Sequence, residues 1–200
     1  KHFTWGFGAF RENVELLDWM REHNRTAAPS RRLRIYGIDL SGSDDMTDAD
    51  RLERALAWPR SWLRRWDAPA ASRVDLPLAA SLTNLKRDTY KRSAASERDA
   101  LTSRIADLIA ELERHRASVR EVTDARDLAR ALRDANVGRL LDAFWRSMPA
   151  PETPASEVMP SIFRPITTRD GAMADNVRWA VAQEGDQGRI LVFAHTAHVL

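Results

Sequence analysis

The chain has 200 residues, with 31 basic and 29 acidic side chains and a formal net charge of +2. This length is enough for one substantial hydrophobic core, and since no stretch approaches the ~18 consecutive apolar residues of a membrane span, we expect no membrane partner. The sequence contains no cysteine, which excludes disulfides and thiolate metal sites and agrees with a reducing, cytoplasmic location.

The basic residues are nearly all arginine, and they alternate with acidic residues, as in residues 111–116 and 124–130. A nucleic-acid-binding protein would cluster its arginines in a stripe with few acids between them. Alternating charges are instead typical of solvent-exposed helix faces that carry ion pairs four residues apart. We therefore expect no nucleic-acid partner.

The first elements along the chain are a helix and a strand. Residues 10–24 space their apolar side chains at helical intervals, which predicts an amphipathic helix. Residues 32–40 are rich in β-formers and predict a strand, and residues 41–45 have the composition of a loop. Asp39 comes at the end of this strand, where it either faces a functional edge of the sheet or serves as a turn or cap residue.

The region from Thr47 to residue 95 begins with a capping-box-like helix start. Pro59 interrupts this helix and fits best in the first turn of a new one, because proline inside a helix removes a hydrogen bond and clashes with the preceding turn. Residues 72–95 favour irregular structure or short helices. A series of tryptophans recurs every four residues, which favours a core-facing stripe over a ligand platform: Trp58, Trp62 and Trp66.

Two long helices are predicted next, one from Ser96 and one over residues 124–148. The apolar phase of the second helix slips near Gly138, which indicates a kink or weak point. The two helices are long enough to form a helical hairpin beside a sheet.

The chain closes with a predicted helix over residues 168–184, a turn, and a strand over residues 189–195 that presents His195 and His198. Alternating helices and strands predict an α/β fold: a central sheet with flanking helices and a long helical hairpin insertion. In such folds ligands collect at the carboxyl ends of the strands, so the two histidines mark a candidate site.

The spacing of His195 and His198 leaves three roles open: metal ligands, acid–base or substrate-contacting groups, and structural residues. A catalytic zinc usually needs three protein ligands, and this pair supplies two. A neutral-pH acid or base suits histidine chemistry directly. Arg169 and Asp170 open the last predicted helix, where they either complement the helix dipole or place a fixed cation in the pocket.

Four sequence blocks occur in a fixed order. They read Trp-Met-Arg-x-x-Asn within residues 12–24, Tyr-Gly-Ile-Asp-Leu-Ser-Gly-Ser at 36–43, Arg-Asp-x-x-Met-Ala-x-Asn-x-x-Trp at 169–179, and Ala-His-Thr-Ala-His-Val at 194–199. In this order they resemble the erythromycin esterase family, and the resemblance spans nearly the whole chain. The helical insert between the second and third blocks is also similar to that of the family.

The resemblance implies a bacterial α/β hydrolase with a helical portion, which opens the macrolactone ester of erythromycin-type antibiotics without a metal or cofactor. A histidine base would activate water, with His195 and His198 in the catalytic cleft. Apart from the resemblance, we expect Arg169 to assist the developing negative charge, and we expect Asp39 or Asp170, from their charge and predicted position, to meet the cationic amino sugar of a macrolide substrate.

The sequence also departs from the family pattern. The family places a base histidine and a neighbouring glutamate in an N-terminal Gly-Glu-x-x-His-Gly block that these residues lack, and Thr196 replaces the usual asparagine between the two histidines. We therefore expect a single domain over residues 1–200, truncated at both ends. Its sheet portion would comprise residues 1–45 and 165–200, and residues 46–150 would be mainly helical.

Two other functions remain open. The protein could act on or bind another ester, a carbohydrate or a polyketide, or it could be a metal-binding module that uses the histidine pair. The oligomeric state does not follow from the sequence.

Overall fold

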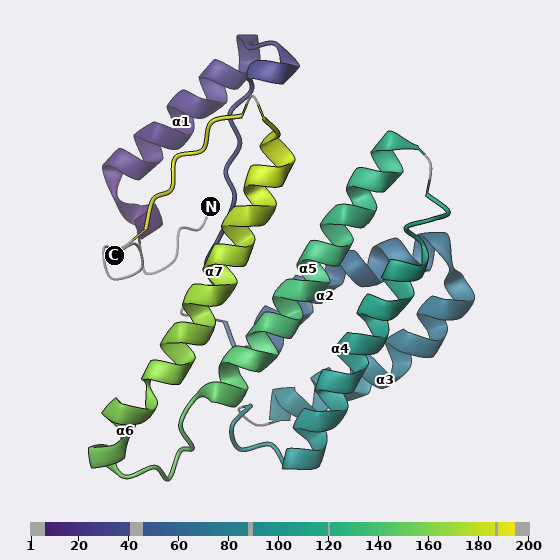
Figure 1. Ribbon diagram of the computed structural model, residues 1–200, viewed down its shortest axis with the longest axis vertical. Coiled ribbons are helices and arrows are strands. Elements are labelled where there is room, and N and C mark those ends of the chain that lie inside the picture. The colour runs from purple at the N-terminus through teal and green to yellow at the C-terminus, as the bar shows by residue number, and fades with distance from the viewer. Residues whose placement is uncertain (1–6, 41–45, 88–89, 120, 187, 195–200) are drawn as a thin grey trace.

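The structure, a computed structural model, describes residues 7–40, 46–87, 90–119, 121–186 and 188–194 (Figure 1). The described part is helical, and no strand occurs in it, so the predicted α/β fold with a central sheet is wrong. The elements are η1 (Phe7–Ala9), α1 (Arg11–Thr26), η2 (Pro29–Arg31), α2 (Asp48–Trp66), α3 (Ala68–Arg87), α4 (Ala95–Arg114), α5 (Val122–Ser147), α6 (Ala155–Ser161) and α7 (Phe163–Glu184).

The two predicted strands are extended segments that lack a strand partner. A strand needs a neighbouring extended chain at about 4.8 Å for its backbone hydrogen bonds. Within the described residues, no backbone hydrogen bond joins residues 32–39 to residues 189–194. Side chains bond the first segment instead: the Asn24 amide accepts from the Leu33 N–H at 2.7 Å and donates to the Leu33 carbonyl at 2.8 Å.

Helices α2, α3, α4 and α5 pack into a bundle that holds most of the hydrophobic core. The capping box predicted at Thr47 is confirmed, since its hydroxyl accepts from the Asp50 N–H at 3.1 Å. Helix α2 then continues through Pro59, so the predicted start of a new helix there is wrong. Pro59 is fully buried, and its packing in the core offsets the hydrogen bond that a proline removes. Of the predicted tryptophan stripe, Trp62 is buried and Trp58 packs against the core, as expected, whereas Trp66 is 38% exposed.

Helix α3 occupies most of the stretch expected to be irregular, residues 72–95. Polar residues and Pro77 hid a helical stripe of buried apolar side chains: Val74, Leu78, Leu82 and Leu85. This stripe packs against α2 and α4, and tertiary packing outweighs the weak local propensity.

The predicted hairpin of long helices is confirmed as α4 and α5, but it packs within the bundle rather than beside a sheet. Helix α5 runs without a break through Gly138. A Cβ at Gly138 would lie 2.7 Å from Leu56 Cδ2 of α2. The glycine therefore marks a close approach of α5 to α2, and the predicted kink at this position is not found.

Helix α7 packs against α5 and lies between the bundle and α1 (Figure 1). Helix α1 has no buried residue among its own, and Trp19 on it is 58% exposed. Residues 188–194 run from the end of α7 back beside α1 (Figure 1). None of the described helices combines the length and the apolarity that crossing a membrane requires.

Candidate functional site

Residues 34–39, which we call the strap, lie along α7 in the opposite direction. At one end the Tyr36 hydroxyl donates to Glu184 Oε1 at 2.6 Å, and Arg34 Nη1 donates to the same carboxylate at 3.1 Å. The Tyr36 ring also packs edge-on against Trp179, with 5.7 Å between centroids. The hydrogen bond from Tyr36 is the main reason why the pKa of Glu184 is lowered, with Arg34 contributing further.

At the other end of the strap, α7 holds Ile38 and Asp39. Asn176 is 5% exposed, and its Nδ2 donates to the Ile38 carbonyl at 2.8 Å. Arg169 donates two hydrogen bonds to the Asp39 carboxylate, from Nε to Oδ1 at 2.7 Å and from Nη2 to Oδ2 at 2.6 Å. The strap thus joins the second and third sequence blocks, which are 130 residues apart at this contact.

The Arg169–Asp39 pair is largely shielded from solvent, with side-chain exposures of 20% and 16%. A two-point guanidinium–carboxylate contact combines charge and fixed geometry, which makes it one of the stronger polar contacts in proteins. The hydrogen bond to Asp39 raises the pKa of Arg169 above its usual value. Arg169 is therefore held in place as a cation whose charge Asp39 neutralises, and its placement in a substrate pocket stays a prediction.

Arg169 and Asp170 do not open the last helix, as the sequence suggested. Helix α7 begins at Phe163, so both residues lie in its second turn. Pro165 falls in the first turn, where the missing proline N–H costs no helical hydrogen bond, and its ring is buried. The dipole interpretation of this pair consequently has no support from its position.

A pocket of about 350 Å³ lies beside the strap, between α7 and the C-terminal extended segment. Its lining is mostly apolar, with one acid and one base: Ile38, Asp170, Met173, Ala174, Val177, Arg178, Val192 and Ala194. Asp170 thus lies in the pocket wall. Arg169 and Asp39 are the sequence neighbours of two lining residues, Asp170 and Ile38. Its walls offer mostly apolar contact surface, and its charged groups are Asp170 and Arg178.

His195 and His198, the predicted catalytic residues, lie outside the described residues. Two other histidines have structural partners: His23 Nε2 lies 3.2 Å from the Arg31 carbonyl, and His115 Nε2 lies 3.7 Å from Asp67 Oδ2. Across the described residues, no group of three or more histidine, aspartate and glutamate side chains is arranged to hold a metal ion.

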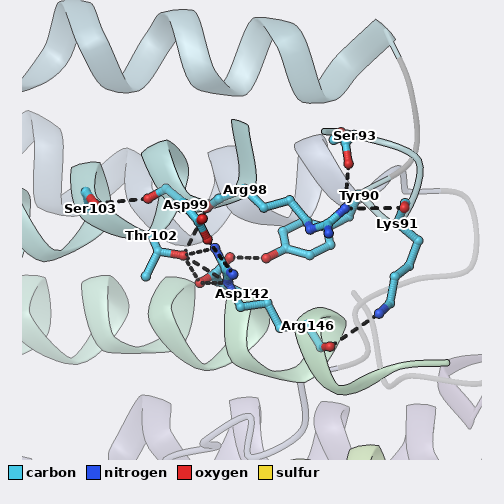
Figure 2. Close-up of polar contacts among 9 residues, drawn as sticks. All are labelled: Tyr90, Lys91, Ser93, Arg98, Asp99, Thr102, Ser103, Asp142 and Arg146. Carbon is cyan, nitrogen blue, oxygen red and sulfur yellow. Dashed lines mark hydrogen bonds and ion pairs between the residues drawn. The ribbon is translucent and has the colours of Figure 1, made fainter. Parts of the chain in front are cut away.

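Sequence reasoning missed a buried polar cluster inside the helical bundle (Figure 2). Tyr90 is fully buried, and its hydroxyl donates a short hydrogen bond to Asp142, which is 2% exposed. Thr102 Oγ1 donates to the other Asp142 oxygen at 2.6 Å, and Arg146 Nε lies 3.3 Å from that oxygen. Arg146 also donates to Asp99 at 2.9 Å, which extends the cluster to the surface.

This cluster joins the turn after α3 to α4 and α5. Burial, followed by the hydrogen bond to Asp142, raises the pKa of Tyr90 well above its usual value. The one local signal in the sequence is the i,i+4 spacing of Asp142 and Arg146. Because each Asp142 oxygen already accepts a hydrogen bond, we interpret the cluster as a structural network that joins these helices rather than as a reactive site.

The comparisons with known proteins give one match. The family model described as erythromycin esterase matches residues 1–200. No curated protein and no solved structure matches the chain significantly. The family name denotes an esterase, a class of hydrolase, and the matched region includes both the strap and α7. The chain belongs to the erythromycin esterase family.

Proposed function

We propose that this protein is a carboxylic ester hydrolase that opens the macrolactone ring of erythromycin-type macrolides. The observation that carries the proposal is the family match over residues 1–200. The structure adds a shielded Arg169–Asp39 pair beside an apolar pocket, an arrangement compatible with binding a large, mostly apolar ester.

The pocket supports a division of roles among the substrate-binding residues. Its apolar walls would contact one face of the macrolactone, and Asp170 would meet the cationic amino sugar. Asp39 is less suited to that second role, because Asp170 lines the pocket and Asp39 does not. We assign Asp39 and Arg169 to shaping the pocket edge. At about 350 Å³ the pocket lies near the small end of ligand sites, so it would hold part of a macrolide.

The chemistry is addition of water to the lactone carbonyl without a metal. A general base takes a proton from water as its oxygen bonds to the carbonyl carbon, which gives a tetrahedral oxyanion. The ring C–O bond then breaks, and the leaving oxygen takes a proton to become a hydroxyl. His195 follows Ala194 of the pocket lining in sequence, and we propose that His195 and His198 orient the water or donate hydrogen bonds to the oxyanion.

Mass spectrometry of erythromycin incubated with the full-length gene product tests this function. We expect a product heavier by one water, formed equally in the presence of a chelator. His195→Ala would abolish product formation while the protein remains folded. His23→Ala is the matched control, because the His23 side chain contacts the Arg31 carbonyl and the Trp19 ring and does not line the pocket, and it should keep full activity. Unchanged erythromycin after incubation with folded protein would reject the proposal.

A further inference from the structure

The side chain of Arg133 on α5 contacts the strap. Its Nη2 donates to the Gly37 carbonyl at 2.8 Å, and its guanidinium carbon lies 4.8 Å from the centroid of the Trp179 ring on α7. A side chain of the bundle thereby contacts both the strap and the helix that carries Arg169. It contacts the strap two residues before Asp39 and on the backbone, so the contact depends on the path of the chain rather than on a strap side chain.

The surroundings of Arg133 restrict it to this position. Its Nη1 lies 3.1 Å from Asp134 Oδ1, and its side chain is 20% exposed. Its Nε is buried and finds no hydrogen-bond acceptor among the described residues. Buried donors without a partner are rare and unfavourable. The guanidinium is therefore held by its other contacts, which are the Gly37 carbonyl, the Asp134 carboxylate and the Trp179 ring.

We propose that Arg133 is a positioning residue, which fixes the Gly37–Asp39 end of the strap and so holds the pocket edge for the substrate. Arg169 and Asn176 fasten that end of the strap from α7. Arg133 adds a contact from α5, which fixes the position of the strap relative to the helical bundle. The inference rests on the proposed function for its catalytic consequence, although the anchor itself can be measured without a substrate.

Arg130 provides a matched control. It lies one turn before Arg133 on α5, pairs with the same carboxylate with 3.7 Å between Nε and Asp134 Oδ2, and lies over a tryptophan ring, 5.1 Å from the Trp58 centroid. Its ring partner belongs to α2 rather than to α7. Arg130→Met and Arg133→Met therefore remove the same charge from the same carboxylate, and of the two side chains Arg133 is the one that contacts the strap; Arg130 is also the more exposed, at 63% against 20%.

A nitroxide label at Gly37 measures the order of the strap. The chain has no cysteine, so Gly37→Cys provides one attachment site. A Cβ at Gly37 would meet no atom within 4 Å, and the backbone carbonyl that accepts from Arg133 remains. A label at Leu76 on α3, which is 75% exposed, reports on the bundle. Electron paramagnetic resonance spectra give the mobility of each label.

We expect Arg133→Met to mobilise the Gly37 label and to leave the Leu76 label unchanged, whereas Arg130→Met changes neither. In the full-length protein, Arg133→Met should also raise KM for the ester with little change in kcat, because the pocket edge binds substrate but takes no part in bond breaking. Equal mobility of the Gly37 label in both variants would overturn the proposal, as would a fall in kcat without a change in KM. Absence of turnover in the unmutated protein would reject the proposed function, and the label comparison would still decide whether Arg133 anchors the strap.

Discussion

The two tyrosines of this chain provide a direct test of the buried cluster. Each hydroxyl donates to a carboxylate, Tyr90 to Asp142 and Tyr36 to Glu184. Tyr90 is fully buried and Asp142 is 2% exposed, whereas Tyr36 is half-buried. Replacing each tyrosine by phenylalanine removes the same atom from two environments that differ in solvent access.

Removing a hydrogen bond to a charged group costs roughly 1.5–3 kcal/mol when the pair is shielded from water. Thr102 and Arg146 still donate to Asp142 in Tyr90→Phe, so the carboxylate is not left without partners. We therefore expect Tyr90→Phe to lower the free energy of unfolding by about 1.5–3 kcal/mol. For Tyr36→Phe we expect about 0.5–1.5 kcal/mol, because that hydrogen bond competes with water.

Urea denaturation of the two variants measures both losses. A loss below about 0.5 kcal/mol for Tyr90→Phe would refute the reasoning, because it would mean that the buried hydrogen bond adds nothing beyond what water provides in the unfolded chain. A loss for Tyr90→Phe no larger than that for Tyr36→Phe would refute the role assigned to burial.

Alkaline titration gives an independent measurement on the same residues. Burial raises the pKa of Tyr90 well above the ordinary value near 10, and burial also raises the pKa of Tyr36. A folded-state pKa above the unfolded value stabilises the protein below about pH 10, and this contribution is lost as the pH rises further. Absorbance of tyrosinate should therefore show Tyr36 ionising first and Tyr90 ionising as the protein unfolds, and Tyr90→Phe should reduce the alkaline loss of stability.

Further measurements test the helix packing and the strap. Gly171→Ala should stabilise the protein by about 0.5–1 kcal/mol in urea denaturation, because the new Cβ meets open space on α7. Gly138→Ala should instead destabilise it, since crowding against Leu56 costs about 1–3 kcal/mol and exceeds the gain in helix propensity; a gain equal to that of Gly171→Ala would contradict the close approach of α5 and α2. Because the pKa of Glu184 is lower in the folded protein than in the unfolded chain, its carboxylate stabilises the fold above the unfolded-state pKa, and this stabilisation is lost as the pH falls through the folded-state pKa. Glu184→Gln should therefore lose less stability than the parent between about pH 5 and about pH 3. Equal acid sensitivity of the parent and this variant would show that the bond from Tyr36 does not favour the carboxylate.

Most helices could be predicted from the sequence, because helical hydrogen bonds are local and leave a periodic trace. The spacing of apolar residues identified α4 and α5, and the capping box at Thr47 placed the start of α2. Gly185 ends α7 near the predicted residue, since its φ of 66° suits glycine. Asp39, Arg169 and Asp170 were predicted as site residues from a strand end and a helix start that the described part of the structure does not contain, and the pairing of Arg169 with Asp39 was not predicted.

The sequence by itself determined the helical periodicity, the even charge pattern and the four blocks that identify the family. Only the tertiary structure decided that residues 34–39 form a strap on α7 rather than a strand, that Pro59 stays inside a helix, and that Asp39 is paired with Arg169. Each of these depends on partners far away in the chain. A strand needs another extended segment, a buried proline needs a core around it, and an ion pair needs both charges in place, and none of these partners can be read from neighbouring residues.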